Sequence, residues 1–124
     1  GYTYSAHPLA CAAGLATLET YQEEDLFARA AGIEAYWQDA IHSLADARHV
    51  IDIRNLGIIA GIELEPRPGA ATARATQAFE TCFDQGLLVR VTGDIIALSP
   101  PLILEREHID RIVETIRAVL AKVD

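Results

Sequence analysis

Apolar residues in the first third of the chain recur at the spacing of α-helices. From Pro8 to about Glu23 the sequence is rich in alanine, and proline suits the first helical position because it has no amide hydrogen to leave unpaired. A second helix is predicted from about Leu26 to Ala47, where apolar residues follow one another at intervals of three and four. The first helix is apolar on nearly all sides, so we expect it to expose an apolar face against which another domain docks.

The pattern then changes to short apolar runs typical of β-strands. Four strands are predicted, at residues 50–54, 58–65, 87–91 and 94–98. We expect a turn at Asn55–Gly57 between the first two, and a hairpin turn at Thr92 and Gly93 between the last two.

Two further helices complete the predicted fold. One runs over residues 73–85, with Gly86 as its C-terminal cap, and the last runs from about 105 to 123. The order helix, helix, strand, strand, helix, strand, strand, helix predicts an α+β fold, a small and mainly antiparallel sheet with helices packed on one face. We see no internal repeat and no second core, so residues 1–124 are expected to form a single domain.

Composition narrows the class of protein. Of the 124 residues 51% are hydrophobic, which excludes disorder, and the net charge of −8 argues against a nucleic-acid backbone or an anionic membrane as partner. No window approaches the roughly 20 apolar residues of a membrane span. Cys11 and Cys82 both lie in apolar helical patterns, so we expect two core residues and a reducing cytoplasm. The absence of methionine and the start at Gly1 indicate part of a longer protein.

Motifs of self-contained enzymes are missing. There is no nucleophile elbow, no phosphate-binding loop and no pair of metal ligands at close spacing, so no metal site is expected. The four histidines lie in different predicted elements. Lys122, the sole lysine, falls in the last helical turn, where a cation usually offsets the helix dipole. The chain therefore offers no buried lysine for a Schiff base, and we expect no catalytic residue within it.

Two residues could bind anions. Thr3 stands with Ser5 and free backbone amides just before a helix N-terminus, a place that can hold a phosphate, although a plain helix cap is the commoner use. Arg90 is flanked by apolar residues on a predicted strand. It could bind a carboxylate, pair with Asp94 across the hairpin, or be exposed on the outer face of the strand.

Three stretches, in the same order, give the chain a family resemblance that covers essentially its whole length. They are GYTYSAHPLACAAGLATLE at the start, RNLGIIAGIEL from Arg54, and the final GLLVR, GD and LSPPLI between Gly86 and Ile103. Together they resemble the C-terminal domain of class III, omega-amino-acid type, aminotransferases that depend on pyridoxal phosphate.

The resemblance implies the small C-terminal domain of a fold-type-I enzyme that works as a homodimer with its active sites at the subunit interface. The lysine that binds the cofactor would lie upstream of Gly1, in a large domain. Thr3 would bind the phosphate of the neighbouring subunit's pyridoxal 5'-phosphate, and Arg90 would hold the substrate carboxylate. Small amino and keto acids would be the substrates.

One departure bears on the substrate. Relatives that act on ornithine, acetylornithine or 4-aminobutyrate place an arginine where this chain has Ala97, whereas here the arginine is Arg90. The resemblance therefore favours beta-alanine or another omega-amino donor with pyruvate as acceptor. Two other hypotheses stay open from the residues alone: a non-catalytic small-molecule-binding or regulatory α+β module, and an unrelated structural domain.

Overall fold

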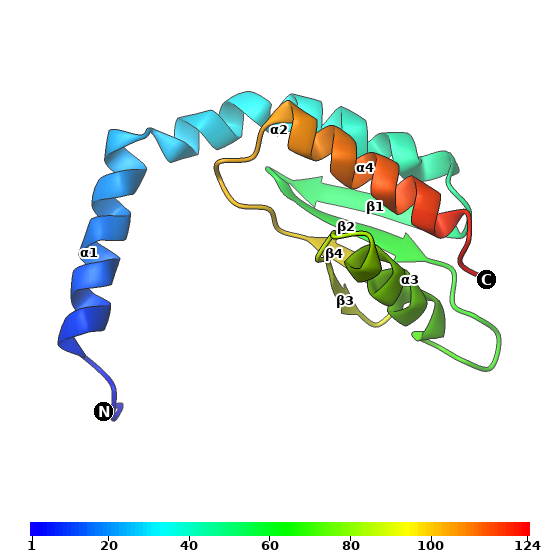
Figure 1. Cartoon of the computed structure of the whole chain (residues 1–124), viewed down its shortest axis with the longest axis horizontal. Coiled ribbons are helices and arrows are strands. Elements are labelled where there is room, and N and C mark those ends of the chain that lie inside the picture. Colours follow the sequence, from blue (N-terminus) through cyan, green and yellow to red (C-terminus); the bar gives the residue numbers. More distant parts are fainter.

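The computed structural model describes residues 1–124 and contains four α-helices, one short 3-10 helix and one four-stranded sheet (Figure 1). The elements in chain order are α1 (Pro8–Glu23), α2 (Leu26–His42), η1 (Ser43–Asp46), β1 (Val50–Leu56), β2 (Ile59–Leu64), α3 (Ala73–Asp84), β3 (Arg90–Thr92), β4 (Ile95–Leu98) and α4 (Arg106–Leu120). None of the helices has the length and apolar character needed to cross a membrane.

The sheet has the order β1-β2-β4-β3 with every neighbouring pair antiparallel, which confirms the predicted α+β class. Each hairpin turns over two residues, and the first is a glycine with positive φ: Gly57 at 56° and Gly93 at 59°. Glycine adopts this conformation without steric cost. The predicted turn at Asn55–Gly57 was placed too early, because Leu56 still pairs with Ile59 at the end of the β1–β2 ladder.

The third predicted strand was too long. β3 is only Arg90–Thr92, whereas residues 87–89 form no ladder, although all of 87–91 was predicted as a strand. The neighbouring strand explains the difference, because β4 ends at Leu98 and is followed closely by Pro100 and Pro101. Continuing this register would put Leu87 opposite Pro100, which has no amide hydrogen to donate, so the ladder has no partner there.

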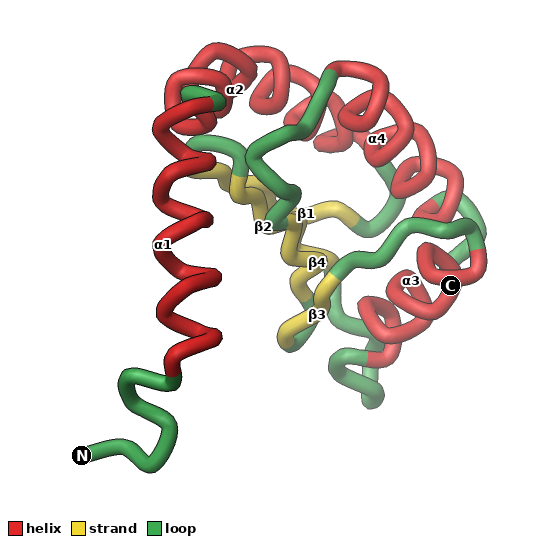
Figure 2. The backbone as a smooth tube through the Cα atoms, turned by 60° about the vertical axis from the view of Figure 1, so that its left-hand side comes forward, coloured by secondary structure: helices red, strands yellow, loops and turns green.

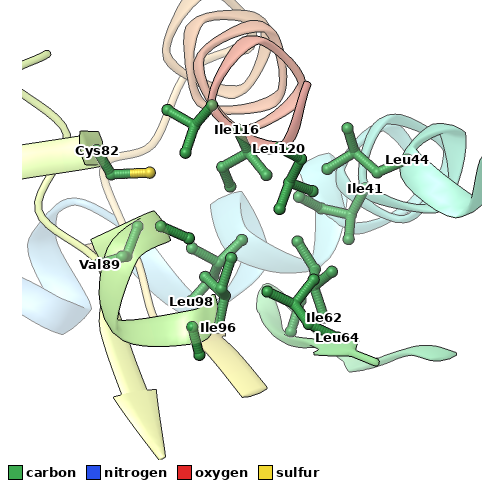
Figure 3. Close-up of a cluster of buried hydrophobic side chains, with 14 of the residues drawn as sticks. Ile41, Leu44, Ile62, Leu64, Cys82, Val89, Ile96, Leu98, Ile116 and Leu120 are labelled. Carbon is green, nitrogen blue, oxygen red and sulfur yellow. The ribbon is translucent and has the colours of Figure 1, made fainter. Parts of the chain in front are cut away.

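Alternation along the central strands puts one face of the sheet into the core. Ala60, Ile62 and Leu64 of β2 are buried, while Ile59, the first residue of β2, is exposed. Helices α2, α3 and α4 cover the buried face, and their side chains meet those of β2 and β4 in Figure 3. The fully buried helical residues are Trp37, Ile41, Ala75, Ala78, Cys82, Ile109, Ile116, Val119 and Leu120. We call the opposite, uncovered side the open face of the sheet.

Helix α1 stands apart from this core. It contains no buried residue, and Figures 1 and 2 show it extending away from the sheet, joined to the rest at the start of α2. Near that corner the rings of Tyr21 and Phe27 meet edge to face, with centroids 5.1 Å apart. The expectation for Cys11 was wrong, because it lies on this exposed helix; Cys82 is in the core, where burial raises its pKa to about 11.

Arginines tie α3 to the last residues of the chain. Arg74, only 5% exposed, donates to the carbonyl of Glu65 and, over 3.1 Å, to the backbone oxygen of Asp124. Arg67 donates to the same Asp124 oxygen over 2.7 Å. His49 lies beside this network, and its Nδ1 is 4.0 Å from the Glu65 carboxylate. Its backbone has φ of 68°, a left-handed conformation that glycine and asparagine accept more readily than most residues.

His49 predicts how the stability of the fold depends on pH. Burial, followed by the charges of Arg74 and Arg48, lowers the His49 pKa below its usual 6.5, so protons bind the unfolded chain more tightly at this site. The free energy of unfolding should therefore fall as the pH is lowered from about 6.5 through the folded-state pKa of His49. Urea denaturation at a series of pH values measures this slope.

Replacing His49 with asparagine, which does not titrate and tolerates the left-handed backbone, should flatten this pH dependence. His42→Asn is a matched control on an exposed histidine. Equal slopes for all three proteins between pH 5 and 7 would show that His49 does not cause the effect.

Candidate functional site

A cleft with a volume of about 840 Å³ opens at one end of the sheet. Its walls are the segment from Gly86 to Arg90, the end of β4 with the following loop, and the first half of α4. Most of its lining is apolar, and Trp37 of α2 contributes to it. A cleft of this size and character is typical of sites for small organic molecules.

Arg90 lines this cleft from β3. It pairs with Ala97 of β4, which in turn pairs with Gly61 of β2, and Gly61 pairs with Arg54 of β1. These residues form a row across the open face, with the two small residues between the arginines. The side chain of Arg90 is exposed and makes no hydrogen bond or ion pair. Its guanidinium is therefore free to accept a carboxylate in the two-pronged geometry that arginine favours.

The structure decides between the structural alternatives for Arg90. Asp94 accepts a hydrogen bond from the Thr72 amide over 2.9 Å and forms no ion pair with Arg90. Exposure on the outer face of the strand is what the structure shows. Arg90 thus serves no visible purpose in holding this chain together.

The other arginine of the row has partners, which sequence reasoning missed. Nη1 of Arg54 donates to the carboxylates of Asp52 and, over 2.8 Å, of Glu63. These contacts raise the pKa of Arg54. The Arg54 side chain lies against Gly61, where an added Cβ would be 3.8 Å from Arg54 Cγ, an ordinary van der Waals contact. In the β1–β2 register Asp52 pairs with Glu63, and Arg54 lies diagonal to Glu63. An arginine close to acids on two neighbouring predicted strands was the signal available in the sequence.

Arg29 holds the loop that forms one wall of the cleft, and it too was missed. Its Nη2 donates to the carbonyl of Ile103 over 3.3 Å and pairs with Glu105 over 3.1 Å. The amide of Glu105 is bonded in turn to Nδ1 of His108, over 3.2 Å, at the start of α4. The loop after β4 is therefore fastened to both α2 and α4, a contact across 74 residues that no local pattern reveals.

The opening segment lies far from the cleft, at the outer end of α1 (Figure 1). Thr3 is exposed in a turn in which the Ser5 amide bonds to the Tyr2 carbonyl and the His7 amide to the Tyr4 carbonyl. The amide of Tyr4 has no backbone partner, whereas that of Ser5 is already used. This chain therefore does not bring Thr3 and Arg90 together, and any site that used both would need another polypeptide segment.

The sole lysine and two of the histidines lie apart from one another. Lys122 is exposed just beyond α4. His7 accepts a bond from the Ala10 amide at the start of α1, and His42 contacts Asn55 at 2.9 Å, so these histidines serve separate elements. No group of three or more potential metal ligands is assembled anywhere in the structure.

Comparison with known proteins identifies the family. The sequence profile described as "Aminotransferase class-III" matches residues 1–120. The chain belongs to the class III aminotransferases, as its three motifs indicated.

Similar proteins agree with this family. An omega-aminotransferase of Caulobacter vibrioides is 83% identical over 124 residues, and an omega-amino acid–pyruvate aminotransferase of Pseudomonas putida is 39% identical over 122. The match covers 100% and 98% of this chain, but only 28% and 27% of those proteins. The chain thus spans a little more than a quarter of the curated relatives it matches.

Solved structures share the fold. A transaminase with L-alanine is 32% identical with a TM-score of 0.90, over 98% of this chain and 30% of that one. The adenosylmethionine-8-amino-7-oxononanoate aminotransferase of Methanocaldococcus jannaschii is 28% identical, also with a TM-score of 0.90, over 100% and 30%. The helices and sheet described above are therefore the arrangement that class III transaminases use in this region.

Proposed function

We propose that this chain is the C-terminal domain of a cytoplasmic, homodimeric transaminase that moves an amino group from an omega-amino acid or amine, such as beta-alanine, to pyruvate. The observation that carries the proposal is the unpaired Arg90 at the mouth of an apolar cleft, in a chain of this family. A related protein carries the name omega-amino acid–pyruvate aminotransferase, which supports the same substrate class.

Pyridoxal 5'-phosphate is the cofactor of this family, and it supplies the electron sink for removal of the amino group. Only part of its binding site fits this chain. The Thr3 hydroxyl and the free Tyr4 amide, close to the N-terminus of α1, suit the phosphate of a neighbouring subunit. The exposed Lys122 does not suit the covalent role, which requires a desolvated lysine. That lysine would belong to the larger part of the whole enzyme.

The role of Arg90 follows from charge and shape. Its guanidinium would donate two parallel hydrogen bonds to the substrate carboxylate, which fixes the orientation of the substrate as well as its position. Ala97 beside it on the same face leaves room for the acid to approach. The apolar wall would accept the carbon skeleton of an amino acid or amine and exclude water from it.

A non-catalytic binding module remains the second candidate, because the cleft and its arginine would equally serve a protein that only holds a small acid. The two functions differ in whether turnover occurs in the whole protein. We favour catalysis because the matched relatives carry transaminase names.

This chain on its own should have no aminotransferase activity. Its sole lysine is exposed beyond α4 and cannot provide the desolvated amine that the cofactor needs. The measurement is alanine formation from beta-alanine and pyruvate with added pyridoxal 5'-phosphate, with the whole enzyme as positive control. Turnover by the purified chain above the rate of the cofactor alone would contradict this assignment.

In the whole enzyme, Thr3→Ala should weaken cofactor retention and Thr3→Ser should largely preserve it. Serine keeps the hydroxyl that would bond to the phosphate, and alanine removes it; a charge-assisted hydrogen bond contributes about 1.5–3 kcal/mol. Equilibrium dialysis of the cofactor distinguishes the variants. If both variants retain it as well as the parent, Thr3 is only a turn residue.

Arg90→Ala in the whole enzyme should raise the KM for pyruvate by roughly tenfold or more, since one charge-assisted contact is worth about 1.5–3 kcal/mol. Simple aralkyl amines, which lack a carboxylate, should keep their rate in the amine half-reaction. Arg90→Lys should restore binding only in part, because an ammonium cannot reproduce two parallel donors.

Stopped-flow measurement of each half-reaction separates the two effects. The structure supplies a control in Arg106→Ala, which removes an arginine that lies over the ring of Tyr36, outside the cleft. Equal losses for acids and plain amines in Arg90→Ala would make Arg90 a fold residue, and the substrate assignment would have to be abandoned.

A further inference from the structure

Two arginines in this chain have no partner, and both lie in the same place. Of the nine arginines, six donate hydrogen bonds to carboxylates or carbonyls, and Arg106 lies 4.7 Å from the ring centroid of Tyr36. Only Arg90 and Arg111 make no such contact, and both line the cleft. Arginines used for structure are paired throughout this molecule, so two free guanidiniums in one cleft indicate a ligand.

The lining of the cleft also contains no acidic residue. None of its 17 residues is aspartate or glutamate, although the chain has 18 of these and a net charge of −8. Ten of the lining residues are hydrophobic, and two are arginines. The cleft is therefore an electropositive, apolar site in an acidic protein, which favours an anion with a hydrocarbon body.

The second arginine lies at the far end of one wall. A Cβ built on Gly86 would be 3.7 Å from Nη2 of Arg111, so the guanidinium lies against the backbone where this wall begins. Gly86 has φ of 79° and follows α3, whereas Arg90 stands four residues on, at the start of β3. An extended chain rises about 3.3 Å per residue, so the backbones at the two ends of the wall are at most roughly 13 Å apart.

We propose that Arg111 is a second anion-binding group, and that the cleft takes small acids with an apolar body and a second acidic group. The proposal rests on the proposed function, because Arg90 holds the first carboxylate. Arg111 then binds the distal acid, and the apolar residues between them contact the chain of the ligand. Straight-chain dicarboxylates have this chemistry, and their half-esters have the same length with one charge fewer.

Calorimetric titration of the whole enzyme tests this directly. The probes are dicarboxylates from adipate to sebacate, each compared with its monomethyl ester. At the best length the diacid should bind roughly three- to tenfold more tightly than its ester, a modest gain because exposed guanidiniums are screened by solvent. The gain should shrink as salt is added, since the contact is ionic.

Substitutions separate the two arginines. Arg111→Gln should abolish the advantage of the diacid and leave binding of the ester unchanged, whereas Arg90→Gln should weaken both. Lys122→Gln removes one positive charge outside the cleft and should alter neither. No advantage of diacid over ester at any length would overturn the inference, and so would equal loss of diacid and ester binding in Arg111→Gln.

Failure of this inference is distinguishable from failure of the proposed function. If Arg90→Gln weakens the esters but the diacids show no advantage, Arg90 keeps its role and Arg111 loses the one assigned to it. If Arg90→Gln leaves the esters unaffected, the carboxylate site itself is misassigned.

Discussion

The register of two short hairpins determines everything on the open face of this sheet. In each, a glycine with positive φ opens a turn of only two residues, which leaves a single way to pair the flanking strands. A slip by one residue would exchange the two faces of a strand. Arg90 would then enter the core and its neighbour Val91 would face solvent, at a cost that the burial of a charged group makes prohibitive. The hydrophobic core and the position of the arginine are therefore set by the same constraint.

Positive charge is scarce in this chain and is used in two distinct ways. Arg29, Arg54 and Arg74 connect different segments of the chain. Arg29 donates to a carbonyl and a carboxylate, Arg54 to two carboxylates, and Arg74 to two backbone oxygens. A guanidinium has several donors in a fixed plane and can satisfy two acceptors at once, which one ammonium cannot do with the same geometry. Such pairs confer specificity of packing more than net stability where they are exposed. The two arginines of the cleft, in contrast, make no contact that holds segments of this chain together.

The sequence was sufficient for the elements and for their order, because hydrophobic periodicity and turn glycines are local signals. Prediction from sequence failed where the structure of a segment depends on the segment that packs beside it. Residues 87–89 resemble a strand by composition, yet β4 ends at Leu98 and Pro100, opposite Leu87, has no amide to donate. Cys11 reads as a core residue by its apolar neighbours, but the helix that carries it has nothing in this chain to pack upon.

For the site, the resemblance pointed to Thr3 and Arg90, and local chemistry alone would have left each with an ordinary alternative. The loop clamp by Arg29 could not be predicted, since it joins residues some 70 positions apart. The acid-free lining could not be predicted either, because it depends on how β4, its following loop and α4 come together in space. Asp94 binds the backbone amide of Thr72 and not Arg90, a partner that no sequence rule would have named.

The corner between α1 and α2 has a mechanical consequence. Because α1 buries none of its residues, its direction within this chain is restrained only near the corner, by the junction at Glu24 and Asp25 and by the contact of Tyr21 with Phe27. Helix α1 therefore carries Thr3 at its outer end (Figure 1). Its inner end joins the start of α2, which contains Arg29, the residue that holds the wall of the cleft. The surface against which α1 packs would therefore set the direction of this helix, and with it the position of Thr3.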